Sequence, residues 1–140
     1  MTEFKKLAHA SGWLELLVAA SAIPAGVGLM IAPDGSAIGL PPSLMYDTPF
    51  PNFFVPGLLL TLFVGGSALV AAYLVWREHH RAPTASLAAG GILLGWIVTQ
   101  LGLIGYVSVL QPLYALIAVA IIALTMLSFR REQDSHWRTS

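Results

Sequence analysis

The sequence contains no cysteine and very few charged residues. Without cysteine, the chain cannot form disulfides, hold an iron–sulfur cluster through thiolates or use a thiol nucleophile. Charged residues make up 10% of the chain, whereas a soluble domain carries about 25% to cover its surface. The formal net charge is zero, so we expect no nucleic-acid partner. A large apolar surface must therefore face something other than water.

Sequence motifs for cofactor or metal chemistry are also missing. We find no glycine-rich phosphate loop, no nucleophile elbow and no zinc signature. The histidines, His9, His79, His80 and His136, all lie outside the long apolar runs, whereas a transmembrane haem needs imidazoles inside them. The adjacent pair in the connector is more typical of a solvated loop than of a metal site. We therefore expect neither a cofactor nor a metal.

What the chain does contain is a set of four apolar runs, at residues 12–31, 56–76, 85–105 and 110–129. Each is close to the roughly 20 residues that a helix needs to cross a bilayer. The first run is longer than the core of a signal peptide and contains Glu15 and Pro24, so we interpret it as a retained span. The sequence predicts an all-α, four-helix transmembrane bundle that forms one membrane domain.

The basic residues predict how this bundle is oriented. An even number of spans places three basic groups on one side of the membrane: Lys5 and Lys6; Arg77 and Arg81; and Arg130, Arg131 and Arg138. The positive-inside rule makes that side cytoplasmic, with both termini there. The opposite side carries Asp34 and Asp47 and neither lysine nor arginine. We therefore expect a multi-pass protein with both termini inside.

The segment at residues 33–55 separates the first two runs and is predicted to form a structured outer cap. It is rich in proline and aromatic residues. Aromatic side chains at its end suit the membrane interface for structural reasons alone. The alternative is an opening for a lipophilic ligand, with Asp34 or Asp47 at its mouth. The residues expected to line that opening are Met45, Tyr46, Phe50 and Phe54.

Small residues at helical spacing follow two of the spans. The third span carries Gly91, Gly95, Thr99 and Gly102, and the second carries Gly57, Thr61 and Gly65. Helices in lipid associate where small residues let their backbones approach closely. The preferred interpretation is packing within the bundle, because each helix needs neighbours in the same chain. The alternative is that one stripe forms an interface between copies of the protein, in a homo-oligomer or a larger membrane complex.

Glu15 is the ionisable residue that stands out within the spans. It shares a helical face with Gly12, Ala19 and Ala22, so it should point into the bundle. Ionisable groups inside spans are expensive and are functional candidates by default. The structural alternative places Glu15 about one turn from the helix end, near the positive end of the helix dipole. There it would pair with Lys5, Lys6 or Arg81.

Gln100 and Trp96 share a face of the third span, opposite its glycines. A buried amide needs hydrogen-bond partners, so Gln100 is expected to join two helices. The alternative is that both residues contact a ligand, and we keep them as candidate ligand-binding residues together with those of the cap and Glu15. A functional site for an enzyme would need two polar groups converging near the membrane centre, and only Gln100 clearly lies there.

Two stretches, TPFPNFFVPG (Thr48 to Gly57) and WIVTQLGLIGYVSVLQPLY (Trp96 to Tyr114), resemble those of small, uncharacterised four-span membrane proteins from bacteria. The resemblance implies the same fold and a location in the bacterial inner membrane. It implies no activity, ligand or catalytic residue.

Three functions stay open from the sequence. The first is a non-enzymatic module that binds a lipid or another hydrophobic ligand, or that serves as an accessory of a larger complex. The second is a small proton-coupled carrier or channel that uses Glu15. The third is an intramembrane enzyme. We rank the binding module first, because Glu15 is expected near the edge of its helix.

Overall fold

The computed structural model describes the backbone of residues 3–46, 48–106 and 108–139. In this part of the chain the regular elements are all helical, which confirms the all-α prediction. The long helices are α1 (Glu3–Ile31), α4 (Ala82–Ile104) and α5 (Leu110–Thr139). The second apolar run is continuous but divided by its hydrogen-bond pattern into α2 (Phe54–Leu59), the π-helical segment η3 (Leu60–Gly65) and α3 (Gly66–Trp76).

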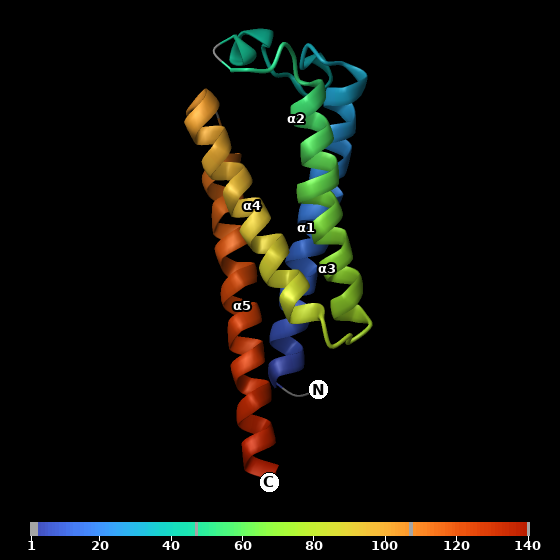
Figure 1. Ribbon diagram of the computed structural model, residues 1–140, viewed down its shortest axis with the longest axis vertical. Helices are drawn as coiled ribbons and strands as arrows, with labels where there is room; N and C mark the ends of the chain where they lie inside the picture. Colours follow the sequence, from blue (N-terminus) through green and yellow to red (C-terminus); the bar gives the residue numbers. More distant parts are fainter. Residues whose placement is uncertain (1–2, 47, 107, 140) are drawn as a thin grey trace.

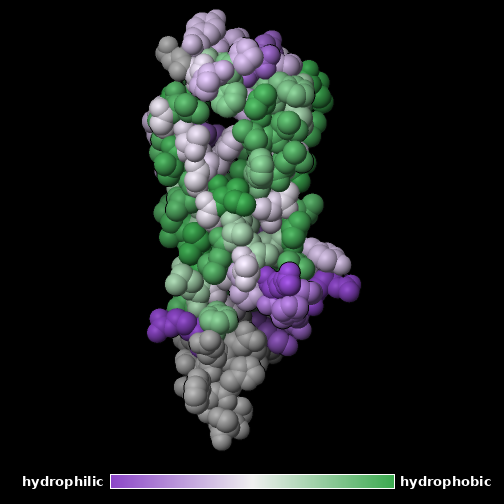
Figure 2. Space-filling view, in the orientation of Figure 1, coloured by the Kyte–Doolittle hydropathy of each residue, from purple (hydrophilic) through white to green (hydrophobic). Residues whose placement is uncertain are grey.

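Four segments of the described chain are long and apolar enough to cross a membrane, as the sequence predicts. They are Lys5–Ile31, Phe54–Trp76, Ala82–Ile104 and Leu110–Arg130. The start of α1 and the end of α5 lie at the same end of the bundle, and the cap lies at the other (Figure 1). Figure 2 shows an apolar band between hydrophilic residues at the two ends. This surface is that of a multi-pass membrane protein.

Three spans begin earlier than the sequence analysis expects, the second of them at Phe54 instead of residue 56. The first helix starts at Glu3 instead of near residue 12, because the intervening residues include good helix formers and no proline. The third span, α4, starts at Ala82 instead of residue 85 and has no side-chain cap. Pro83 suits this first turn because its missing N–H would have no helical partner there.

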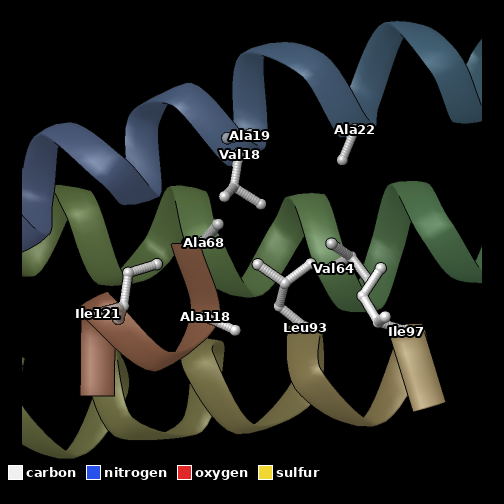
Figure 3. Packing of buried hydrophobic residues seen from close by; sticks show 9 residues of the cluster. All are labelled: Val18, Ala19, Ala22, Val64, Ala68, Leu93, Ile97, Ala118 and Ile121. Carbon is white, nitrogen blue, oxygen red and sulfur yellow. The ribbon is translucent and has the colours of Figure 1, made fainter. Parts of the chain in front are cut away.

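The four spans meet at a core of small and branched side chains. The residues Val18, Ala19, Ala22, Val64, Ala68, Leu93, Ile97, Ala118 and Ile121 form this core cluster. They come from α1, η3, α3, α4 and α5 and point into the space between the helices (Figure 3). Small residues at such a crossing allow the close backbone approach that stabilises helix contacts in lipid.

The second span packs most closely on α1, at glycines. A Cβ atom on Gly57 would lie 2.6 Å from Cβ of Leu29 and 2.7 Å from the carbonyl oxygen of Gly26. One on Gly65 would collide with the side chain of Ile23. Thr61 donates its hydroxyl to the Gly57 carbonyl at 2.9 Å. This bond satisfies a backbone acceptor where the chain enters the wide π turn.

The glycine stripe of the third span does not pack inside the bundle. A Cβ atom added to Gly91, Gly95 or Gly102 would meet nothing within 4 Å, and Thr99 is exposed beside them. The preferred interpretation of this stripe is therefore corrected. The neighbouring Gly90 faces α5 instead, since its added Cβ would lie 2.7 Å from Cγ1 of Ile122. A shift of one residue turns a position by about 100° around the helix, so the sequence stripe lay on the wrong face.

The segment before the second span folds back over the helix ends (Figure 1). It contains two short 3-10 turns, η1 (Ser36–Ile38) and η2 (Pro42–Met45). Its ends are joined by a hydrogen bond from the Phe53 N–H to the Pro33 carbonyl, 2.9 Å long. Gly35, near the start of this segment, adopts φ 85, a left-handed conformation that glycine reaches without steric cost. Leu29, Met45 and Phe53 form a small buried cluster beneath the turns.

Candidate functional site

A cavity of about 630 Å³ opens at the end of the bundle that holds the start of α1. We call it the basal cavity. Its rim carries ionisable side chains, Lys5, His9, Glu78, His79 and His80, and its deeper wall carries hydroxyls, Ser11, Ser86, Thr125 and Ser128. Figure 2 shows hydrophilic residues gathered at this end of the visible face. A cavity of this size that combines apolar walls with several polar groups can admit a small molecule.

Glu15 lies directly behind the hydroxyl wall and has an exposed fraction of 0%. The Ser11 hydroxyl, one turn earlier on α1, donates to its Oε1 at 2.9 Å. Ser86 of α4 lies beside the same carboxyl. The second oxygen, Oε2, has no hydrogen-bond partner among the described residues. Glu15 is thus a fully buried carboxyl that is only half satisfied by hydrogen bonds, a costly arrangement in a folded chain.

A second hydroxyl, that of Thr125, extends this polar contact toward α5. Its Oγ1 lies 3.4 Å from the Ser11 Oγ. It donates to the carbonyl oxygen of Ile121 at 2.7 Å. The site therefore joins α1, α4 and α5 through groups that exchange hydrogen bonds readily, and it brings no permanent charge next to Glu15.

The structural alternative for Glu15 placed it near the helix end and paired it with a basic residue. Both parts of this prediction are wrong. Glu15 lies about three turns into α1, on the order of 18 Å from its start, so the helix-terminal charge is too far away. Among the described side chains, the one ion pair joins Lys5 to Glu78, with Nζ and Oε1 3.4 Å apart. Lys6 and Arg81 are exposed. The carboxyl therefore has no basic partner in this part of the chain.

The other side of Glu15 is closed by the core cluster. Val18, Ala19 and Ala22 follow on the same helix and are all buried. They pack with apolar side chains of the other spans (Figure 3). The nearest cross-helix polar contact beyond them is the hydrogen bond from the Tyr114 hydroxyl to the Ser21 Oγ, 2.6 Å long. In this conformation Glu15 lies next to the basal cavity and is separated from the cap end by apolar packing.

Aromatic rings form the wall of the molecule beside the basal cavity. The rings of His9 and Trp76 have centroids 4.6 Å apart, and Trp13 meets Trp76 edge-on at 5.3 Å. The Arg77 guanidinium lies 5.7 Å from the centroid of the Tyr73 ring. Tryptophan and arginine in this arrangement are typical of a membrane–water interface. The basal cavity therefore opens beside residues of the kind that membrane proteins carry at their interface.

The residues predicted to line a lipophilic opening in the cap do not form one cavity. Tyr46 is 78% exposed and Phe54 also points outward, while Met45 is buried. Phe50 packs against the small cluster beneath the cap. A shallow groove of about 290 Å³ does bring Met45 and Tyr46 together with Asp34. Asp47 lies outside the described residues, so its part in the prediction stays untested.

Trp96 and Gln100 do not approach Glu15. Trp96 packs against the core cluster, about 15 Å further along α4 than Ser86. Gln100 is half-buried and lies about 21 Å along α4 from Ser86. The structure thus divides the predicted candidates between two ends of the bundle.

Sequence reasoning missed the hydroxyl wall. Ser11 precedes Glu15 by four residues, the spacing at which side chains on one helix meet, and this signal was available. Ser86 and Thr125 come from other helices, and no local pattern links them to Glu15. Among the described residues, no group of three His, Asp or Glu side chains lies close enough to hold a metal ion.

No family model, curated protein or solved structure matches this chain. The site therefore has to be interpreted from its own geometry.

Proposed function

We propose that the protein is a small proton-coupled carrier in which Glu15 binds the proton and the basal cavity admits a small-molecule substrate. The observation that carries this proposal is a fully buried carboxyl with an unpartnered oxygen and no basic partner among the described residues. A buried carboxylate without a counter-charge is unfavourable, so it must take up a proton or a cation. Such a group can couple its charge to the contents of the adjacent cavity.

The volume and the one-sided position of the basal cavity support the same function. Its volume of about 630 Å³ falls within the range of about 300–1,000 Å³ found for small-molecule sites. The core cluster separates Glu15 from the cap end. A carrier needs a binding group that is accessible from only one side of the membrane at a time. In the described conformation, the closed apolar layer blocks access to Glu15 from the cap end.

The orientation and location belong to the same proposal. The basic residues place the basal cavity on the cytoplasmic side, with both termini. The resemblance to small bacterial four-span proteins supports a location in the bacterial inner membrane. The substrate would then reach the described conformation from the cytoplasm. This ranking reverses the order from sequence alone, which put a lipid-binding or accessory module first.

Proton flux in liposomes tests this function. Purified protein would be reconstituted into vesicles that contain a pH-sensitive dye, and an imposed pH gradient would be followed over time. We expect the gradient to collapse several-fold faster with the wild-type protein than with Glu15→Gln, which keeps the shape of the side chain and cannot titrate. Equal rates in the two proteins would reject the carrier. The absence of flux from both would favour a binding or accessory module.

A further inference from the structure

Hydroxyl groups form the layer between the basal cavity and Glu15. Ser11, Ser86 and Thr125 all line the cavity, and each is buried. Ser11 and Ser86 also interact with the Glu15 carboxyl on their other side. Because the carboxyl itself is not exposed, a proton that moves between cavity water and Glu15 must pass this layer.

The hydrogen bonds within the layer are limited by the number of hydrogens. An ionised carboxylate only accepts, and each hydroxyl donates one hydrogen. Ser11 gives its hydrogen to Glu15 Oε1 over 2.9 Å, and Thr125 gives its own to the Ile121 carbonyl over 2.7 Å. The 3.4 Å contact between the two hydroxyl oxygens therefore has no hydrogen of its own while Glu15 is ionised. Ser11 is left with a free lone pair that can accept.

Protonation of Glu15 reverses these roles. A proton on Oε1 makes the carboxyl the donor and Ser11 the acceptor. The Ser11 hydrogen is then free to turn toward Thr125 or toward water in the cavity. Ser86 interacts with the carboxyl from the opposite wall, and the Ser11 Oγ lies 2.9 Å from Oε1. Of the three hydroxyls, Ser11 has the geometry to exchange a hydrogen directly with Glu15.

We propose that Ser11 is the proton-relay residue of this site, an inference that rests on the proposed role of Glu15. Hydrated protons in the basal cavity donate to Ser11 Oγ while the hydroxyl hydrogen of Ser11 moves to Glu15 Oε1. One O–H bond forms on the carboxyl, one breaks on the hydronium ion, and Ser11 ends with one hydrogen as before. Release follows the reverse path. Thr125 lies 3.4 Å from the Ser11 oxygen and can accept the Ser11 hydrogen once Glu15 is protonated.

Other titratable groups lie further from Glu15. Lys5 and His9 of α1, Glu78 after α3, and His79 and His80 of the connector line the cavity rim. From α4 the Ser86 hydroxyl lies beside the carboxyl, and from α5 the Thr125 hydroxyl contacts Ser11. The rim groups can change the local proton supply, so a test must separate their titration from that of Glu15.

Time-resolved infrared spectroscopy after a pH jump makes that separation. The carbonyl stretch of the protonated Glu15 is the band that Glu15→Gln removes, and its rise reports the uptake of the proton by this group alone. The measurement would use the full chain in detergent or nanodiscs. We expect Ser11→Ala to slow the rise of this band by at least about tenfold. This is less than the 10²–10⁴-fold contribution to the rate that is typical of a positioned proton-transfer group. The final amplitude should be retained.

Two further variants control this experiment. Ser86→Ala removes the matching hydroxyl from the opposite wall and should change the rate by less than about twofold, because it is outside the relay. Ser11→Thr restores a hydroxyl and should recover most of the rate. An unchanged rate in Ser11→Ala, or equal slowing in both alanine variants, would overturn the relay.

The outcomes also separate the relay from the carrier. If the band is absent from the wild-type protein at every pH, Glu15 does not titrate and both proposals fail. If the band rises and only Ser11→Ala slows it, the relay holds whatever the liposome flux shows. A missing flux would then reject the carrier alone.

Discussion

At the scale of single residues, Glu15 combines complete burial with an unpartnered carboxyl oxygen. A buried charged group is weak evidence for stability, since replacement by an apolar residue of similar volume is often neutral or stabilising. The core that surrounds it is apolar and closely packed. The half-satisfied carboxyl is therefore a local weakness in that core, which the proposed proton binding explains.

At this scale we expect Glu15→Met to be at least as stable as the wild-type protein. The substitution removes an unpartnered buried oxygen and keeps the side-chain volume. Thermal unfolding in detergent measures the effect. The matched control is Ile121→Ala in the same core, which should lose roughly 2–5 kcal/mol because it leaves a cavity. A large loss of stability in Glu15→Met would instead assign a structural role to the carboxyl.

Asp34 in the cap makes a prediction about pH. The Ser36 hydroxyl and then the Ser36 backbone N–H hold the pKa of Asp34 below its ordinary value, and the N–H lies 2.9 Å from Oδ1. A lowered pKa contributes stability that is present above the unfolded pKa and is lost as the pH falls through the folded one. Carbon NMR of the carboxyl should show the low pKa, and Ser36→Ala should move it back up. An unchanged pKa in that variant would rule out the hydroxyl as its cause.

At the scale of elements, glycines of similar appearance have opposite roles. Gly26 sits where α1 meets the second span, and a Cβ there would collide with Thr61 and lie 2.6 Å from the Gly57 carbonyl oxygen. Gly95 faces open space on the outside of α4. The sequence shows both as small residues in apolar helices, and only the packing distinguishes them.

This difference predicts a matched pair of variants. Gly26→Ala should lower thermal stability by roughly 1–3 kcal/mol, because backbone atoms would have to move apart. Gly95→Ala should be neutral or slightly stabilising, since alanine favours a helix by about 0.5–1 kcal/mol. Thermal unfolding of both proteins in one detergent gives the comparison. Equal destabilisation would mean that the α4 stripe is buried, for example between copies of the protein.

The contact between α1 and α5 allows a smaller, quantitative prediction. The Tyr114 hydroxyl donates to Ser21 across the two helices at 2.6 Å. Hydrogen bonds between transmembrane helices contribute about 0.6 kcal/mol on average, so Tyr114→Phe should lower stability by about that amount. Tyr106→Phe, at an exposed tyrosine, should change nothing measurable. A loss well above 2 kcal/mol would indicate that this bond belongs to a larger network.

For the whole molecule, the number and type of helices follow from length and hydropathy, and both predictions are confirmed. Local sequence patterns, such as the four-residue spacing of Ser11 and Glu15, also predict part of the candidate site. Contacts between the spans cannot be predicted from length and hydropathy. Lipid-facing and buried helix faces are both apolar in this chain, so hydropathy cannot tell which face of α4 meets α5. That is why Gly90 was missed and Gly91, Gly95 and Gly102 were misplaced.

The orientation in the membrane is a property of the whole chain and stays a prediction. Because the sequence lacks cysteine, a single introduced thiol can be labelled without background. An impermeant thiol reagent on intact cells should label Ser36→Cys and leave His79→Cys unlabelled, as the basic residues require. Permeabilised cells, in which both should react, provide the control. The reverse pattern would invert the topology and place the basal cavity outside.

The π-helical segment η3 has a consequence for how the chain tolerates insertions and deletions. A π turn holds one more residue than an α turn, so deletion of one residue within Leu60–Gly65 could restore a regular helix. Because the wide turn absorbs the extra residue, the two halves of the span would keep nearly the same faces toward α1 after such a deletion. A deletion elsewhere in the span would instead turn one half by about 100°, so that either Gly57 or Val75 would lose its contact with α1. We expect this span to tolerate a one-residue deletion within Leu60–Gly65 far better than a one-residue deletion elsewhere along it.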